Sequence, residues 1–342
     1  MRAITVTKNE ADQRLDKFLR KYLNLAGSSF IYKMLRKKNI TLNGKKCDGS
    51  ERILAGDVVT LFLADETIEK FSQVQLQAVR RRKLDIIYED QDIILINKPA
   101  GMLSQKAKDT DESLVEYLID YLLDKKRLSP EDLKAFRPSV CNRLDRNTSG
   151  IVVAGTSLPG LQQMSEAIRE RTLGKYYLCV VAGCLRESRE ISGWLKKDEH
   201  SNQVRVLSRQ EEGAVPIRTM YRPVSVGERH TLLEVKLITG RSHQIRAHLA
   251  SLGHPIVGDP KYGKPAVNQA AREQFKVNTQ LLHAWKLVMP EELSGTLSGL
   301  SGKTFTAPMP SGMERMVREV CPGAEKKPEV KDFMMRKKGG IG

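Results

Sequence analysis

A polar segment near the middle of the chain reads Asn142-Arg143-Leu144-Asp145-Arg146-Asn147-Thr148-Ser149-Gly150, and an apolar stretch follows it at residues 151–154. Asp145 stands between two arginines, which favour the ionised form of a carboxylate when they stay close to it. An ionised and partly buried aspartate can act as a nucleophile or a base. From these residues alone, a purely structural ion pair is the alternative interpretation.

Two later segments carry polar side chains at short spacing. The first reads Gly240-Arg241-Ser242-His243-Gln244-Ile245-Arg246-Ala247-His248. As a helix, it would place Arg241 on one face to meet a carboxylate, and Arg246 on another to meet phosphate. The second, residues 253–263, contains glycines and prolines that fix an irregular loop. Taken singly, the first segment is explained by an ordinary polar helix and the second by a packed loop.

The composition restricts the classes of function. With 342 residues and 40% hydrophobic residues, the chain is long enough for two domains and too apolar to be wholly disordered. Its formal net charge of +16 predicts a polyanionic partner, although a basic protein without such a partner is the alternative. The chain has no apolar run long enough to cross a membrane, and its first residues contain no apolar core. We therefore expect no signal peptide, no membrane partner and a cytoplasmic location.

The sequence gives no sign of a metal or a cofactor. Its 5 cysteines are odd in number and scattered, without a C-x-x-C pair, and its 6 histidines form no H-E-x-x-H. Neither of the glycine-rich patterns that bind nucleotide phosphates occurs. We therefore expect no disulfide framework, no metal site and no cofactor.

The N-terminal part predicts a small basic unit. Leu15, Phe18, Leu19, Tyr22 and Leu23 have the spacing of an amphipathic helix, and a second helix is predicted from an N-cap at Ser28 through Lys38. Strands are predicted at 40–42 and 57–62, with an Asn43-Gly44 turn after the first. This order resembles the S4 RNA-binding domain. The candidate RNA-binding residues here are Arg14, Lys17, Arg36, Lys37 and Lys45, unless these helix faces are merely solvated.

The rest of the chain predicts more strands than helices. Strands are expected at 84–88, 93–96, 151–154, 176–181, 203–207 and 232–237, with helical periodicity at 114–122. We therefore expect an α+β fold with a mainly antiparallel mixed sheet, not a doubly wound one. The polar stretch from Glu66 to Lys83 predicts a linker. The expected organisation is an S4-like domain at 1–70, a basic linker at 71–83, a catalytic domain at 84–310 and a basic tail at 311–342 whose end is disordered.

Taken together and in order, these segments resemble the RluA-type family of RNA pseudouridine synthases. The segment around Asp145 resembles the family's catalytic motif, and the two later segments resemble its late motifs. The likeness extends to three further stretches: Asn97-Lys98-Pro99-Ala100-Gly101, Lys175-Tyr176-Tyr177 and Leu282-His283-Ala284. It covers nearly all of residues 84–290, and an N-terminal S4 domain is common in the family.

The resemblance implies a role for each matching residue. Asp145 falls on the essential aspartate, Tyr177 on the tyrosine that packs against the target base, and Arg241 on the arginine that pairs with the aspartate. Arg143 falls on the arginine that can fill the space left by a flipped base. Lys98, Lys175 and Arg246 are further candidates for contacting RNA. Asn142 departs from the histidine of many members, which leaves the local hydrogen bonding open.

The implied activity is the isomerisation of uridine to pseudouridine in structured RNA, which needs no redox cofactor. Large-subunit ribosomal RNA, or its precursor particle, is the expected substrate of a monomeric enzyme, and transfer RNA is the alternative. A non-catalytic RNA-binding or ribosome-assembly factor is the third possibility, against which the retained Asp145, Tyr177 and Arg241 argue.

Overall fold

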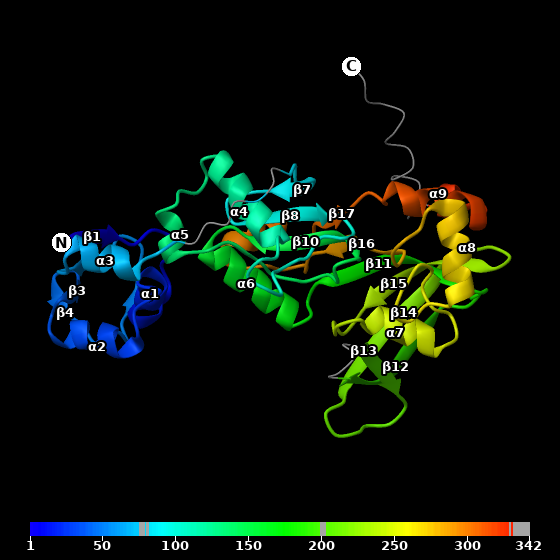
Figure 1. Ribbon diagram of the computed structural model, residues 1–342, viewed down its shortest axis with the longest axis horizontal. Coiled ribbons are helices and arrows are strands. Elements are labelled where there is room, and N and C mark those ends of the chain that lie inside the picture. Colours follow the sequence, from blue (N-terminus) through cyan, green and yellow to red (C-terminus); the bar gives the residue numbers. More distant parts are fainter. Residues whose placement is uncertain (75–78, 80–81, 199–202, 328–329, 331–342) are drawn as a thin grey trace, which may run out of the picture.

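The computed structural model describes residues 1–74, 79, 82–198, 203–327 and 330. It shows an elongated molecule with the N-terminal region at one end and a large sheet running through the remainder (Figure 1). Among the described residues, no helix combines the length and the apolar character that a membrane span requires.

The N-terminal region packs short helices against a small antiparallel sheet. Its elements are β1 (Arg2–Thr5), β2 (Gln13–Arg14), α1 (Leu15–Tyr22), α2 (Ser28–Arg36), β3 (Ile40–Leu42), β4 (Lys45–Lys46), β5 (Arg52–Ile53), β6 (Val58–Leu61) and α3 (Asp65–Phe71). The sheet order is β1-β6-β3-β4, and β2 pairs separately with β5. The predicted apolar stripe of α1 is buried as expected, and Asn43 and Gly44 form the turn with φ of 50° and 73°.

Three predictions for this region need correction. Ser28 is the first residue of α2 and Gly27 is its N-cap, and the helix ends at Arg36. The polar stretch predicted as a linker begins with a helix, α3, because Ile68 is buried and the Phe71 ring lies 4.8 Å from that of Phe30. Strand β1 was not predicted. Residues 75–78 and 80–81 of the predicted linker lie outside the described residues.

The large sheet is mixed and mainly antiparallel, so the predicted α+β class is confirmed. Across the sheet the strands are β13 (Gln203–Leu207), β12 (Arg189–Asp198), β14 (Val215–Val226), β15 (His230–Leu237), β11 (Gly174–Ala182), β16 (Leu282–Val288), β10 (Ser149–Gly155), β8 (Ile93–Lys98) and β7 (Ile86–Glu89), with β17 (Thr304–Thr306) beside β16 and β9 (Ser139–Val140) beside β10. The pairing of β10 with β16 is parallel, which brings the segment that follows Asp145 beside Leu282-His283-Ala284.

Helices cover both faces of this sheet (Figure 1). They are α4 (Leu114–Asp124), α6 (Leu158–Arg169), α7 (Gln244–Ser251), α8 (Pro265–Phe275) and α9 (Ser311–Val320). The short helix α5 (Asp132–Ala135) lies toward the N-terminal region, and 3₁₀ turns occur at Gly295–Leu300 and Ala324–Lys326. Side chains of α4 and α7 share one continuous core with the sheet face that carries Tyr177. The opposite face packs on α8 and α9 at one end and on α6 at the other.

The segment predicted as a basic tail is ordered at its start. Helix α9 buries Met313, Met316 and Val317 against the sheet, because these apolar residues recur at helical spacing among the charges. The predicted disorder at Arg336–Gly340 falls outside the described residues.

The N-terminal region contacts the large domain through α5. The Tyr22 hydroxyl donates a hydrogen bond to Glu131 Oε1 (3.2 Å), and Ala135 is buried in the same apolar cluster as the core of α1. The region is therefore packed on the large domain as well as joined to it by the chain.

Candidate active site

Asp145 lies in the loop between β9 and β10, with about a quarter of its side chain exposed at 26%. The loop is held on both sides of the aspartate. Ser104 Oγ accepts a hydrogen bond from the Leu144 N–H and donates one to the Leu144 carbonyl, both at 3.0 Å. The Gly101 N–H donates to the Arg146 carbonyl (2.9 Å). The carboxylate is thus presented by a fixed backbone and stays accessible to a substrate.

The guanidinium partner of Asp145 is Arg246 on α7. Its Nη1 donates to Asp145 Oδ2 (2.7 Å), while Nε and Nη2 donate to the two oxygens of Asp259 (2.7 and 2.9 Å). Burial opposes the charge of Arg246, but the bonds to both carboxylates raise its pKa above the ordinary value. The planar guanidinium is therefore fixed in one orientation and permanently charged beside Asp145.

The predicted pairing of Arg241 with Asp145 is wrong in this structure. Helix α7 begins only at Gln244, after His243 in a left-handed conformation, so Arg241 lies in the turn before the helix with its side chain exposed. The buried Arg246, predicted to meet phosphate, takes the place next to Asp145 instead. The pairing was assigned to Arg241 from the family resemblance, but α7 begins at Gln244 and it is Arg246 that contacts Asp145.

Asp259 was not singled out from the sequence, although its loop was. Its side chain is fully buried and also accepts the N–H groups of Lys261 (2.9 Å) and Tyr262 (3.2 Å). Burial would raise the pKa of Asp259, but Arg246 and these backbone groups lower it. The irregular glycine-rich loop thus positions the carboxylate of Asp259 to bind the Arg246 guanidinium.

Tyr177 lies on β11, on the sheet face that forms the core with α4 and α7. Burial, and then the negative charge of Asp145, raise the pKa of Tyr177 well above its ordinary value. The phenol therefore stays protonated at neutral pH, with its ring close enough to Asp145 to sense the charge.

Near the start of β10, just after the loop of Asp145, Gly150 occupies a position with no room for a side chain. Gly150 has φ of +113°, and a Cβ there would lie 2.2 Å from the Ala284 carbonyl oxygen on β16. The adjacent Ser149 Oγ is 2.9 Å from His283 Nδ1, and His283 Nε2 donates to the Ala307 carbonyl (3.2 Å). Because a carbonyl can only accept, the proton of the neutral ring is on Nε2. Nδ1 is therefore unprotonated and accepts a hydrogen bond from the serine hydroxyl. These contacts explain why the two motifs occur together.

Comparison with known proteins fits this geometry. A profile described as RNA pseudouridylate synthase matches residues 92–251, and a profile of the S4 domain matches residues 13–59. The chain is 30% identical over 321 residues to ribosomal large subunit pseudouridine synthase D of Escherichia coli (strain K12), with 92% of each chain covered. It is 31% identical over 285 residues to ribosomal large subunit pseudouridine synthase C of Vibrio vulnificus (strain CMCP6), covering 82% of this chain and 86% of the relative.

The chain belongs to the RluA-type family of RNA pseudouridine synthases. It is therefore an isomerase that forms pseudouridine, and it carries an S4 domain that binds RNA. The fold resembles that of human RNA Pseudouridylate Synthase Domain Containing 4, with a TM-score of 0.55 and 21% identity over 68% of this chain and 91% of that chain.

Lys98 is buried in this RluA-type synthase and has a structural role. It ends β8 with 0% exposure, and its Nζ donates to the carbonyls of Pro99 (3.0 Å), Met102 (2.8 Å) and Arg146 (3.1 Å). The predicted contact of Lys98 with RNA is therefore wrong, and its side chain ties the first motif to the loop of Asp145. Burial lowers the pKa of Lys98 to about 7, although the charge of Asp145 acts in the opposite direction.

Asn142, which stands where many RluA-type synthases have histidine, forms two hydrogen bonds with backbone groups. Its Oδ1 accepts from the Val153 N–H (2.7 Å) and its Nδ2 donates to the Ile151 carbonyl (3.3 Å). Both partners are backbone groups of β10. The amide therefore anchors the loop to the strand, which answers the question that the substitution raised.

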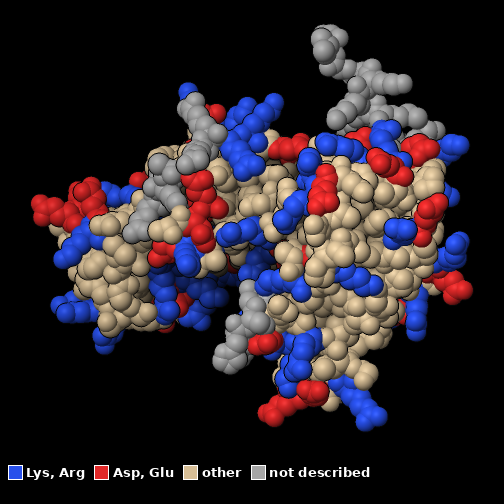
Figure 2. All heavy atoms as spheres, turned by 45° about the vertical axis from the view of Figure 1, so that its right-hand side comes forward, with Lys and Arg blue, Asp and Glu red and all other residues tan. Residues whose placement is uncertain are grey.

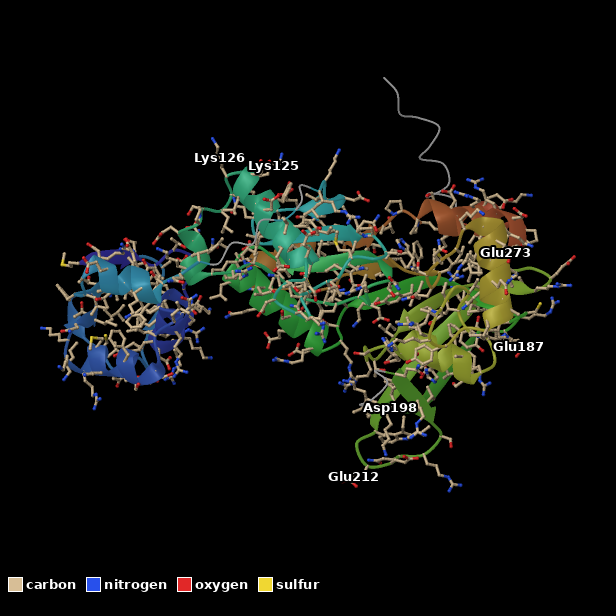
Figure 3. The ribbon with its side chains drawn as sticks, viewed as in Figure 1. Lys125, Lys126, Glu187, Asp198, Glu212 and Glu273 are labelled. Carbon is tan, nitrogen blue, oxygen red and sulfur yellow. The ribbon has the colours of Figure 1, made fainter. Side chains whose placement is uncertain are left out.

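The remaining candidate basic residues lie at or near the surface. Arg143 is exposed, as are Arg14, Lys17, Arg36, Lys37 and Lys45 in the S4 domain, while Lys175 is partly buried and its pKa is lowered by burial and by Arg171. Arg14 is engaged with Asp16 (3.0 Å). Figure 2 shows lysine and arginine side chains bordering the hollow between the N-terminal region and the large domain. Acidic side chains such as Asp198 and Glu212 lie at the far end of the β12–β13 region (Figure 3).

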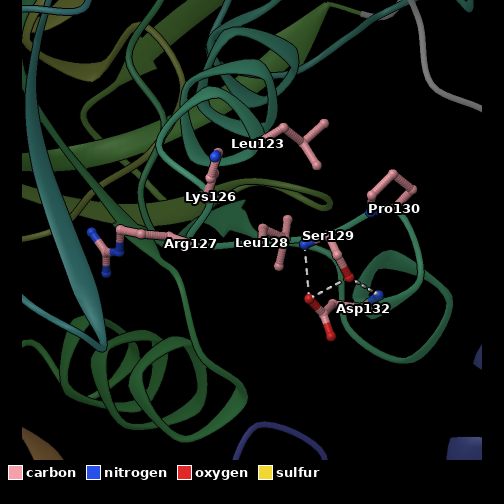
Figure 4. A pocket seen from close by; sticks show the side chains of 7 residues that line it. All are labelled: Leu123, Lys126, Arg127, Leu128, Ser129, Pro130 and Asp132. Atoms are coloured by element: carbon pink, nitrogen blue, oxygen red, sulfur yellow. Dashed lines mark hydrogen bonds between the residues drawn. The ribbon is translucent and has the colours of Figure 1, made fainter.

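A surface cavity of about 500 Å³ lies apart from this site. It is lined by the end of α4 and the start of α5, where Ser129 Oγ donates to Asp132 Oδ2 (2.7 Å) (Figure 4). None of the residues predicted to be catalytic lines it. Among the described residues, no cluster of histidine, cysteine and acidic side chains could hold a metal ion.

Proposed function

We propose that this synthase isomerises specific uridines in large-subunit ribosomal RNA, with Asp145 as its catalytic carboxylate and the target nucleotide flipped out of its helix. The observation that carries the proposal is the accessible Asp145 held by the buried Arg246, which is itself fixed by Asp259. A merely structural ion pair would not need a carboxylate that is open on one side.

The reaction breaks the bond between N1 and C1′, turns the base, and joins C1′ to C5. The proton leaves C5 and N1 gains one, so no atom or electron is gained overall. A carboxylate can serve by attack on C1′ or C6, or by removing a proton from the sugar, and each route needs an anion close to the glycosidic bond. Arg246 supplies the matching positive charge without transferring a proton.

Tyr177 would provide a wall for the base. Its raised pKa keeps the hydroxyl protonated, which favours packing against the uracil ring over acting as a phenolate base. The exposed Arg143, two residues before Asp145, would occupy the space that the flipped nucleotide leaves. Flipping costs a few kcal/mol, and such a substitute offsets part of that cost.

The choice of large-subunit ribosomal RNA rests on the named relatives. The proteins of Escherichia coli and Vibrio vulnificus are described as ribosomal large subunit pseudouridine synthases, and each is matched over more than four-fifths of this chain. The S4 domain with its exposed basic residues fits a large structured RNA.

The test is single-turnover conversion of large-subunit ribosomal RNA by the purified chain and by Asp145→Asn. We expect the variant to bind RNA normally and to form no product, because the amide keeps the shape and loses the charge. Asp109→Asn, which changes an exposed aspartate, is the matched control and should convert normally. Near-normal conversion by Asp145→Asn would refute the catalytic role of Asp145. If the wild type converts transfer RNA and not ribosomal RNA, the proposed substrate is wrong and transfer RNA replaces it.

A further inference from the structure

His243 combines an unusual backbone with a position next to the catalytic aspartate. It precedes α7 with φ of 57° and ψ of 11°, a left-handed conformation that non-glycine residues seldom adopt. Its Nε2 lies 3.9 Å from Asp145 Oδ2, and 13% of its side chain is exposed. Strained residues of this kind persist where the surrounding structure requires them, often at active sites.

A chain of hydrogen bonds fixes which ring nitrogen carries the proton. The Val204 N–H on β13 donates to the Tyr262 hydroxyl oxygen (2.9 Å), and this oxygen is 3.0 Å from His243 Nδ1. Among the hydrogen bonds of the described residues, the Tyr262 hydroxyl has no other acceptor for its own proton. It therefore donates to Nδ1, which leaves the proton of the neutral ring on Nε2.

The ring stays neutral in this setting. Burial lowers the pKa of His243, Asp145 and Asp259 raise it, and Arg246 and Lys261 lower it, with a net shift downward. At neutral pH the group beside Asp145 is thus a neutral N–H donor and not a second cation.

This donor is not used within the described part of the protein. A separation of 3.9 Å is too long for a hydrogen bond to Asp145, whose Oδ2 already accepts from Arg246. A directed N–H donor, held in one orientation at the edge of a catalytic site, is the arrangement that recognises a polar substrate atom.

We propose that His243 is a substrate-contacting residue whose Nε2–H donates to an oxygen of the uridine bound at Asp145, with Tyr262 holding the ring in that orientation. This inference rests on the proposed function and adds a contact to it. The partner is a carbonyl oxygen of the base or a hydroxyl oxygen of the ribose, since both accept hydrogen bonds. Because Tyr262 is itself held by β13, the outer strand of the sheet contributes to the orientation of the donor.

The experiment compares His243→Leu, which removes the donor, with His243→Gln, whose amide nitrogen can reach the position of Nε2. Single-turnover rates and half-saturating RNA concentrations are measured on a ribosomal RNA substrate. We expect His243→Leu to lower the rate about 10²-fold, as loss of one active-site donor does. RNA affinity should change less than about threefold, because phosphate contacts dominate it. His243→Gln should recover most of the rate, and His230→Leu, at the start of β15, is the control.

A second readout is independent of activity. Nitrogen-15 spectra of histidine-labelled protein should show His243 with its proton on Nε2 in the wild type, and a mixture of the two ring forms in Tyr262→Phe. An Nδ1–H form in the wild type, or unchanged turnover in His243→Leu, would overturn the inference. Equal loss in the Leu and Gln variants would also overturn it. Failure of the wild type to form any pseudouridine would instead overturn the proposed function, and this inference with it.

Discussion

One guanidinium serves two carboxylates at the centre of this site. Arg246 uses three N–H donors on Asp145 and Asp259, so that the partly exposed Asp145 is oriented, through Arg246, by the buried Asp259. A lysine would supply charge without the planar fork that satisfies both partners. Arg246 and Arg241 belong to the same motif, but only Arg246 contacts Asp145, whereas Arg241 is exposed.

We predict that Arg246→Lys lowers the single-turnover rate about 10²-fold or more, because one of the two carboxylates loses its partner. Arg241→Lys, at an exposed position of the preceding turn, is the matched control, and its rate at saturating RNA should stay within about threefold of wild type. Equal rates for both variants would show that the pairing seen here is not used in catalysis.

The residues of the site could be predicted from the sequence only in part. Asp145 was singled out because it stands between two arginines in a contiguous motif, and Tyr177 only because it falls on a motif of the family that the sequence resembles. Arg246 was assigned to the wrong task, since a helix starting at Arg241 and one starting at Gln244 turn different side chains inward. Asp259 lies 13 residues from Arg246, and no local periodicity links the two.

Strands β10 and β16 approach each other without room for a side chain at Gly150. The parallel pairing places Gly150 opposite Ala284, where an added Cβ would overlap the backbone. This close approach sets where the loop of Asp145 leaves the sheet.

We predict that Gly150→Ala lowers the free energy of unfolding by about 2–4 kcal/mol, through backbone strain and overlap. Gly213 also has positive φ, but nothing lies within 4 Å of its Cβ position. The variant Gly213→Ala therefore measures the cost of the backbone conformation without that of a steric overlap. Its cost should be about 1 kcal/mol. Urea unfolding measures both, and a similar loss in the two variants would contradict the proposed overlap.

The buried Lys98 predicts a pH dependence of stability. Its pKa is about 7 in the folded chain and near the ordinary value of 10.5 in the unfolded chain. Between these values the unfolded chain binds more protons, so stability rises with pH, by up to about 1.4 kcal/mol per unit. Below pH 7 both states are protonated and this dependence ends.

We therefore predict that Lys98→Met reduces the rise in unfolding free energy between pH 7 and pH 9 that the wild type shows. The variant should also be less stable by roughly 2–4 kcal/mol at pH 7, because three backbone carbonyls lose their donor. Denaturant titrations at several pH values measure both effects. Parallel pH profiles for the two proteins would show that Lys98 does not titrate in this range.

Elements with a clear period were predictable, and those stabilised by distant partners were not. Strand β10, which follows the loop of Asp145, and helix α1 were predicted from the apolar pattern and the helical spacing. Helices α3 and α9 were missed because each has only a few apolar side chains among many charged ones. These side chains, such as Ile68 and Met316, stabilise the helices by packing against other parts of the chain. The mainly antiparallel class of the sheet was predicted, but its strand order depends on pairings far apart in the sequence.

The whole molecule places a basic RNA-binding domain at one end and the site of Asp145 in the large domain. The two parts meet at α5, where Tyr22 bonds to Glu131. Basic side chains line the hollow between them (Figure 2). This arrangement suits a long RNA that is held at one position and modified at another.

We predict that replacing Arg36 and Lys37 together by glutamate weakens RNA binding and lowers its salt dependence. The log–log slope should fall by about 0.7–0.9 for each RNA phosphate that is no longer neutralised. Conversion at saturating RNA should stay near wild type, since neither residue lies in the large domain. A fall in the saturated rate with unchanged affinity would contradict an RNA-binding role for these residues.

The most direct test is a map of pseudouridine in total RNA from cells that lack this chain, complemented with the wild type or with Asp145→Asn. We predict that one or more positions of large-subunit ribosomal RNA lose pseudouridine and that only the wild type restores them. An unchanged map, or restoration by Asp145→Asn, would contradict the central claim that Asp145 catalyses this isomerisation.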